Sequence, residues 1–268
     1  MRKKILYIFI STAICIICGV AYSFYNYYAP PKLRQPYLTN ATKEDTLRIA
    51  FIGDSWAFMH ENHECMIPRL LQDSLHRPVK VHSYGISGLT SKEIYENILD
   101  NSDFKQFFSK RRYGFCYVSA GINDTYKKMS TSYYQQSMDG IIQFLLFNHI
   151  HPIIQEIPDY DIYMSFERQT ISKKLLRSLS MIINNTPLDC KQLFRDALKD
   201  MIHEKNYEDK VSIIKYKSWN GNGKNDLNHI YRSDRMHLNG TGYDALDIAI
   251  AKEIQKQITA EHSSKPLP

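Results

Sequence analysis

Four short polar segments, far apart along the chain, carry the groups that would let a serine hydroxyl attack an ester. In chain order they are residues 53–56 (Gly-Asp-Ser-Trp), 85–88 (Gly-Ile-Ser-Gly), 121–124 (Gly-Ile-Asn-Asp) and 234–237 (Asp-Arg-Met-His). A serine hydroxyl is a weak nucleophile at neutral pH, so it needs a base that takes its proton and a third group that orients this base. The last segment supplies both, since His237 can act as the base for Ser55 and Asp234 can orient the imidazole.

Two further residues are candidates for stabilising the charge that develops during this attack. The oxyanion needs hydrogen-bond donors already aimed at it, and losing one donor costs about 100- to 1,000-fold in rate. The backbone N–H of Gly88 and the side-chain amide of Asn123 can supply such donors. Asp54, next to the serine, is expected to hold its own loop by local hydrogen bonds, because an adjacent residue seldom reaches the far nitrogen of the base.

Apolar runs alternate with helical patterns, which predicts βαβ units around a mostly parallel sheet. We expect strands at residues 47–52, 79–84, 113–119, 152–156 and 211–214. Helical spacing predicts helices at residues 91–99, 137–147, 171–183, 193–202 and 242–258, the first of them with a capping box at Thr90 or Ser91 and Glu93. The expected fold is a three-layer α/β/α, flavodoxin-like, mostly parallel five-stranded sheet.

Three of the candidate residues then follow strands directly. Ser55, Gly88 and Asn123 come after the first, second and third expected strands. The carboxyl ends of parallel strands lie along one rim of the sheet, where open α/β sheets bind their ligands. Residues far apart in sequence are therefore expected to converge on one small site.

The four segments together resemble the SGNH hydrolases, also called GDSL-type esterases and lipases, from about residue 47 to the C-terminus. The resemblance implies a catalytic Ser55, His237 and Asp234. It also implies an oxyanion hole made of the backbone N–H of Ser55 with Gly88 and Asn123, and neither a metal nor an organic cofactor.

Two positions depart from the pattern of that family. Trp56 stands where Leu is most common, and it is expected to narrow the pocket or to add a stacking surface. Tyr84 stands near the position where the second block often begins with Asn, which leaves the hydrogen bonding of that loop open.

The N-terminus is expected to anchor the protein in a membrane. Arg2, Lys3 and Lys4 precede an uncharged stretch whose residues 5–22 are nearly all apolar, close to the roughly 20 residues that span a bilayer as a helix. Aromatic residues follow at 22–28, as at a membrane interface, and the basic start predicts a cytoplasmic N-terminus and an exported remainder. The alternative is a cleaved signal peptide, with residues 19–21 (Gly-Val-Ala) as its cleavage site and a secreted or periplasmic product.

This division gives three parts: residues 1–28 as cytoplasmic tip and transmembrane anchor, 29–45 as a proline-containing linker, and 46–268 as the hydrolase domain. The net charge of +6 does not indicate a nucleic-acid partner, because residues 1–35 hold five basic and no acidic residues, which leaves +1 for the rest. The expected partners are an ester substrate, such as an acylated glycan or lipid, and the membrane.

The cysteines and the other histidines are weaker evidence for a structural or functional role. Cys116 is expected in the core, and a disulfide between Cys65 and Cys190 is left open. His60 and His63 follow the candidate nucleophile closely and are expected on a surface loop, with a place in the wall of the pocket as the alternative. With the neighbouring glutamates they match no standard metal-site spacing.

The sequence therefore predicts an esterase acting through an acyl-enzyme, with O-acetyl esters of cell-envelope glycans as the favoured substrate and lipids or thioesters second. An O-acyltransferase and a non-catalytic glycan-binding envelope protein remain alternatives on the same scaffold.

Overall fold

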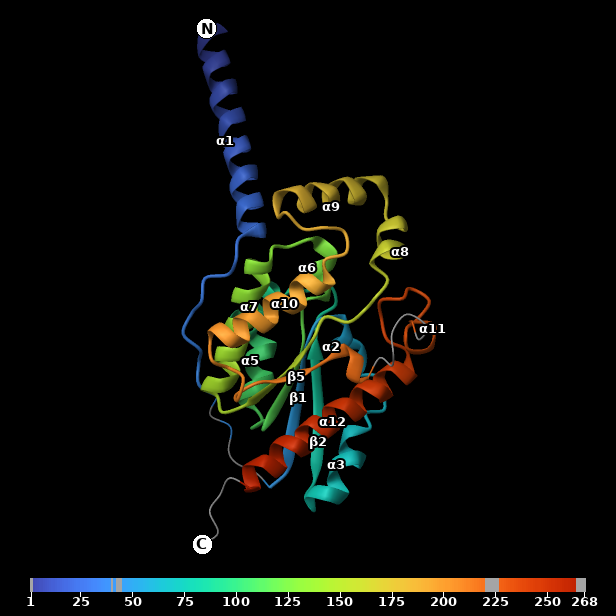
Figure 1. Ribbon diagram of the computed structural model, residues 1–268. Coiled ribbons are helices and arrows are strands. Elements are labelled where there is room, and N and C mark those ends of the chain that lie inside the picture. Colours follow the sequence, from blue (N-terminus) through green and yellow to red (C-terminus); the bar gives the residue numbers. More distant parts are fainter. Residues whose placement is uncertain (1, 40, 42–44, 220–226, 264–268) are drawn as a thin grey trace.

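The computed structural model describes residues 2–39, 41, 45–219 and 227–263 (Figure 1). Met1, residues 40 and 42–44 of the expected linker, and residues 220–226 and 264–268 of the expected domain lie outside this described part. Five parallel strands form one sheet in the order β2-β1-β3-β4-β5. They are β1 (Leu47–Gly53), β2 (Val79–Gly85), β3 (Phe115–Ser119), β4 (His151–Gln155) and β5 (Ser212–Ile214). The predicted flavodoxin-like, five-stranded parallel sheet is confirmed.

Alternate residues of each strand feed two separate apolar cores, one on each side of the sheet. Along β1, Ala50 and Ile52 join one core, whereas Ile49 and Phe51 join the other, and all four are fully buried. The first core is covered by α4 (Ser91–Asp100), α5 (Ser102–Ser109), α7 (Thr131–Phe147) and α10 (Lys191–Glu204). The second is covered by α2 (Ser55–His60), α3 (Ile67–Leu75) and α12 (Gly240–Ser263). These helices and the sheet make the three predicted layers.

The predicted helices are present. Capping side chains determine where some of them begin. Thr90 caps α4 in the predicted capping box with Glu93. The helix expected from residue 137 begins at Thr131, because the Ser130 side chain accepts a hydrogen bond from the Tyr133 N–H and so starts α7 earlier. The remaining short helices are α6 (Ile122–Lys127), α8 (Ile162–Glu167), α9 (Ile171–Ile183) and α11 (Leu227–Ile230), with a 3₁₀ turn at Tyr216–Ser218.

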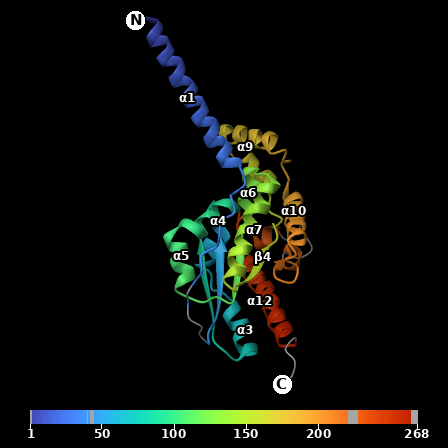
Figure 2. The same ribbon diagram turned by 90° about the vertical axis from the view of Figure 1, so that its left-hand side faces the viewer.

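Helix α1 (Arg2–Tyr28) projects from one end of the molecule (Figures 1 and 2). Its segment Ile10–Tyr28 has a mean hydropathy of 1.3 and is exposed along most of its length, whereas Tyr28 at its end is buried against the domain. By length and composition it is the one helix of the described residues that could cross a membrane, although a signal sequence has the same properties.

The stretch after α1 is extended but attached to the domain. Arg34 forms a two-pronged ion pair with Asp100, at 2.8 and 3.0 Å, and its backbone N–H donates to the Tyr95 hydroxyl. Further along, the Thr39 N–H donates to the Asn148 side chain at 2.7 Å. These bonds hold residues 34–39 of the expected linker along α4 and α7.

Candidate active site

Ser55 is the first residue of α2, directly after β1. The chain can make this abrupt turn because Gly53 adopts a φ of +144°, and a Cβ there would lie 2.0 Å from the Ser119 carbonyl oxygen. Asp54 then caps α2: its Oδ1 accepts from the Trp56 N–H at 3.0 Å and from the Ser119 hydroxyl at 2.9 Å. The predicted local role of Asp54 is confirmed, and these bonds fix the serine at the rim of the sheet.

The loop before α12 brings a histidine and an aspartate to this serine. His237 Nε2 lies 3.0 Å from the Ser55 hydroxyl oxygen, and His237 Nδ1 lies 2.7 Å from Asp234 Oδ2. With the Nδ1 proton directed at the carboxylate, Nε2 is left to accept a proton from the serine. The three residues therefore have the geometry of a nucleophile, a base and a group that orients the base.

Asp234 is held in its charged form by the turn in which it lies. Its Oδ1 accepts the backbone N–H groups of Met236 and His237, both at 2.9 Å. Burial raises the pKa of Asp234, but these two N–H groups and the imidazole lower it more, so that it lies below its usual value. A carboxylate that stays ionised can stabilise the imidazolium that forms when His237 takes a proton.

The two loops expected to hold the oxyanion follow β2 and β3, the strands on either side of β1. Ile86, at the start of one loop, donates its N–H to the Gly53 carbonyl at 3.0 Å, which places residues 85–89 against the end of β1. Gly88 has a φ of +84°. The Asn123 side-chain amide donates to the Leu89 carbonyl at 3.0 Å, and this bond uses one of its two hydrogens.

Asp124, the last residue of the third polar segment, is a buried link between these loops. It accepts from the Ser91 backbone N–H at 2.9 Å and from the Ser91 hydroxyl at 2.5 Å. Burial raises the pKa of Asp124 to about 6, while the two bonds from Ser91 lower it. The sequence signal was present, since an Asp follows the candidate asparagine, but only the fold shows that its partner is the first residue of α4.

The expected role of Trp56 in the pocket is wrong. Its side chain is 1% exposed and packs edge-on against the rings of Trp219 and Tyr231. Its indole N–H donates to the Met236 carbonyl at 3.2 Å, and its own carbonyl accepts from the Tyr243 hydroxyl. Trp56 therefore packs beneath the loop that contains His237 and stabilises it. Its side chain does not line the substrate pocket.

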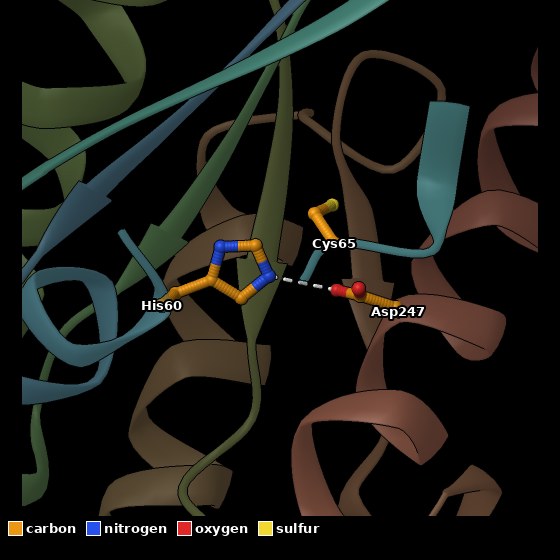
Figure 3. A group of neighbouring side chains, drawn as sticks. All are labelled: His60, Cys65 and Asp247. Carbon is orange, nitrogen blue, oxygen red and sulfur yellow. Dashed lines mark hydrogen bonds and ion pairs between the residues drawn. The ribbon is translucent and has the colours of Figure 1, made fainter. Parts of the chain in front are cut away.

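The expectation that His60 lies on a surface loop is also wrong. Its side chain is buried, and its Nε2 lies 2.9 Å from Asp247 Oδ1 (Figure 3). Its Nδ1 lies 3.1 Å from the Ser83 hydroxyl. This second serine, histidine and aspartate set joins α2, β2 and α12. His63, the other histidine of this expectation, lies near the surface and pairs with Asp244 at 3.1 Å.

Cys65 completes a cluster with these residues, and His60, Cys65 and Asp247 offer nitrogen, sulfur and oxygen atoms within 4.8 Å of one another. Each oxygen of Asp247 already has a hydrogen-bond partner, because Oδ1 contacts His60 and Oδ2 accepts from the Met66 N–H at 2.7 Å. We interpret the cluster as a hydrogen-bonded link between helices.

The disulfide that the sequence left open between Cys65 and Cys190 is not formed. Both thiols are free. Cys65 packs into the core beneath α3 and α12, whereas Cys190 packs into the core on the opposite side of the sheet. Cys116 is buried in the core, as predicted.

Comparison with known proteins agrees with this architecture. Residues 51–245 match the model of the GDSL-like lipase/acylhydrolase family, so the chain belongs to this family and is an ester-hydrolysing enzyme. None of the curated proteins compared with the chain matches it.

Several solved structures share the fold. The lipase/acylhydrolase from Enterococcus faecalis has a TM-score of 0.55 at 15% identity, over 79% of this chain and 96% of that one. A GDSL-like lipase from Bacteroides thetaiotaomicron has a TM-score of 0.52 at 17% identity, over 78% and 88%. The acetyl xylan esterase AlAXEase has a TM-score of 0.52 at 15% identity, over 78% and 100%.

Proposed function

We propose that Ser55 is the nucleophile of a serine esterase, with His237 as its base and Asp234 as the residue that orients the base. The observation that carries this proposal is the continuous pair of contacts from Ser55 Oγ to His237 Nε2 and from His237 Nδ1 to Asp234, at 3.0 and 2.7 Å. It connects residues 182 positions apart in sequence.

The reaction is a double displacement. Ser55 Oγ attacks the ester carbonyl carbon while its proton passes to His237 Nε2, and the carbonyl oxygen becomes an oxyanion that the N–H groups of Ser55 and Gly88 and the Asn123 amide receive. The tetrahedral intermediate expels the alcohol, which takes the proton from His237, and an acyl group remains on Ser55. Water then gives a proton to His237 and attacks the acyl-enzyme, and His237 returns this proton to Ser55 Oγ as the bond to the acyl group breaks and the acid is released.

We further propose that residues 1–28 anchor the enzyme, that residues 29–45 connect the anchor to the domain, and that residues 46–268 act outside the cytoplasm. O-acetyl esters of cell-envelope glycans are the substrate that fits this location, and a similar structure is named as an acetyl xylan esterase. The apolar Ile10–Tyr28 segment and the basic residues before it support this topology.

The test uses the full-length protein in detergent with chromogenic acyl esters and acetylated glycans. Ser55→Ala is expected to lower the rate by at least about 10,000-fold, because members of a triad act as a unit. Ser83→Ala is the matched control, since it removes a serine from the His60 and Asp247 set, and it should retain hydrolysis. A Ser55→Ala protein that is folded and fully active would overturn the proposed mechanism.

A further inference from the structure

Helix α9 turns its apolar face outward. Its exposed apolar side chains are between 45% and 79% accessible: Ile171, Leu175, Leu176, Leu179, Ile182 and Ile183. The face turned toward the protein is polar and includes the buried Arg177 and Ser180. A helix on a water-exposed surface has the opposite arrangement, and an apolar patch of this kind marks an interaction site.

The inward face of α9 is fixed by specific contacts. The Arg177 guanidinium lies 4.4 Å from the centre of the Tyr126 ring and 5.4 Å from that of Phe166. Asn184, which follows the helix, donates to the Lys128 carbonyl at 2.7 Å. These contacts keep the six apolar side chains on the outside.

The position of α9 relative to α1 indicates what covers this face. The Tyr28 hydroxyl, in the last turn of α1, is hydrogen-bonded to the Ser180 hydroxyl of α9 at 2.5 Å. Tyr28 and Phe24 pack with Met129 and Tyr133 of the domain. The C-terminal end of α1 is therefore fixed both against α9 and against the domain.

A lysine fixes the end of α1 to the domain as well. Lys92 of α4 donates to the carbonyl of Asn26 at 2.7 Å and to that of Ala29 at 3.0 Å, which satisfies carbonyl groups at the C-terminus of the helix. Figures 1 and 2 both show α9 beside this end of α1 and running across it. A bilayer spanned by α1 would have its surface at α9, with the axis of α9 along that surface.

The charge of this region suits a membrane surface. Residues 168–188 contain four basic residues, Arg168, Lys173, Lys174 and Arg177, and no acidic residue. Basic residues beside an apolar helix face are typical of helices that lie in the interface of membranes with anionic lipids. Tyr163 of α8, which is 56% exposed, and Tyr22, Tyr25 and Tyr27 of α1 add aromatic rings of the kind that favour this depth.

We propose that α9 is an interfacial membrane helix, which lies with its apolar face in the surface of the bilayer that α1 spans. The proposal rests on the proposed anchor. The bilayer is favoured over a second copy of the chain because the hydrogen bond between Tyr28 and Ser180 fixes the end of a candidate membrane span against the inward face of α9, which leaves the apolar face of α9 free beside that span.

This contact directs the candidate active site toward the membrane. The segment that leads into α8 and α9 is bonded to the loop of Asp234 and His237: the Asp161 N–H donates to the Arg235 carbonyl at 3.1 Å, and Arg168 donates to the Ser233 carbonyl at 3.3 Å. In Figure 1, α3, which precedes β2, lies at the end of the molecule opposite α9, so the strands run toward α9. The enzyme would therefore act on esters presented close to the bilayer surface.

The test places single tryptophans in the full-length chain, reconstituted in vesicles that contain anionic lipid and phospholipid brominated on the acyl chain. Ile182→Trp probes α9, Val20→Trp probes α1, and Leu70→Trp on α3 is the control at the far end. Both native tryptophans, Trp56 and Trp219, are buried in the domain and give the same background in every variant.

Bromolipid is expected to lower the added emission of Ile182→Trp by about twofold or more, because an interfacial helix places its apolar face about 5–10 Å into the bilayer. Val20→Trp should be quenched as well, and Leu70→Trp should not.

Quenching of Val20→Trp alone would overturn the docking of α9, and an Ile182→Trp emission that is blue-shifted but unquenched would indicate cover by a second copy. Loss of quenching in both would overturn the anchor and the docking together. Hydrolysis of a soluble ester in the same vesicles reports separately on the proposed esterase activity.

Discussion

The indole N–H of Trp56 donates to the carbonyl of Met236 at 3.2 Å, across 180 positions of sequence. These two residues are the immediate neighbours of Ser55 and His237. The bond therefore joins the two segments that carry the proposed nucleophile and base, and it helps to set the distance between their side chains.

Trp56→Phe should impair catalysis more than stability. Phenylalanine retains an aromatic ring in the core but lacks the N–H, so the His237 loop loses one support. We expect kcat to fall by about tenfold with KM little changed, and the free energy of unfolding to fall by about 1 kcal/mol. Trp219→Phe is the control, because the Trp219 indole nitrogen has no hydrogen-bond partner among the described residues. An equal loss of kcat in both variants would contradict the positioning role.

Asn123→Ala separates a role in the oxyanion hole from a role in the loop. In the structure its amide donates to the Leu89 carbonyl, so removal could simply loosen residues 85–89. If the second N–H receives the oxyanion, Ala should cost about 2.7–4 kcal/mol in kcat with substrate binding little altered. Asn123→Asp should be at least as harmful, because its negative charge would repel the oxyanion. A normal kcat in folded Asn123→Ala protein would remove this donor from the mechanism.

Asp54 should make the stability of the protein depend on pH. Burial raises the pKa of Asp54 to about 6, while its bonds from Trp56 and Ser119 lower it. Because this value lies above that of an unfolded aspartate, the favourable contribution is complete below about pH 4 and is lost as the pH rises through about 6.

Asp54→Asn should remove this dependence, since the amide oxygen can still accept from Trp56 and Ser119. Relative to the natural protein, the variant should gain about 3 kcal/mol in unfolding free energy between pH 4 and pH 8. Urea unfolding in detergent, followed by tryptophan fluorescence, measures this difference. The exposed Asp73→Asn exchange should show little change, and parallel curves for all three proteins would contradict the prediction.

Two glycines at the rim should respond differently to the same substitution. Gly53→Ala would place a methyl group 2.0 Å from the Ser119 carbonyl oxygen, so we expect failure to fold or a loss above about 4 kcal/mol. At Gly88 a Cβ meets no atom within 4 Å, so the cost is that of its positive φ, about 1–2 kcal/mol. Thermal unfolding of the two variants tests this order, and a Gly53→Ala protein as stable as Gly88→Ala would contradict it.

The N-terminal segment should keep the protein in the membrane fraction. We expect resistance to extraction by high salt, because an apolar span is not held by charge, and we expect protease added outside the cytoplasm to reach the domain. Recovery of soluble protein whose N-terminus lies near Tyr22 would show that the segment is a cleaved signal.

Some features of the molecule follow from local pattern alone. The strands could be placed because most of them are short apolar runs. Their parallel order then brings Ser55, Gly88 and Asn123 to one rim. Asp234 and His237 lie within one turn, so their contact depends on nearby backbone. The motif around each of these residues was therefore sufficient to identify it as a candidate site residue.

Other features depend on which distant segments meet, which a pattern of residue types does not encode. His60 and Trp56 appeared free to face solvent or substrate, but α12 and the loop before it supply Asp247 and the Met236 carbonyl and so bury them. The periodicity of residues 171–183 predicted an amphipathic helix, yet only tertiary structure decided which face it turns inward. It did so because Arg177 packs on Tyr126 and Ser180 bonds to Tyr28, which leaves the apolar face outside.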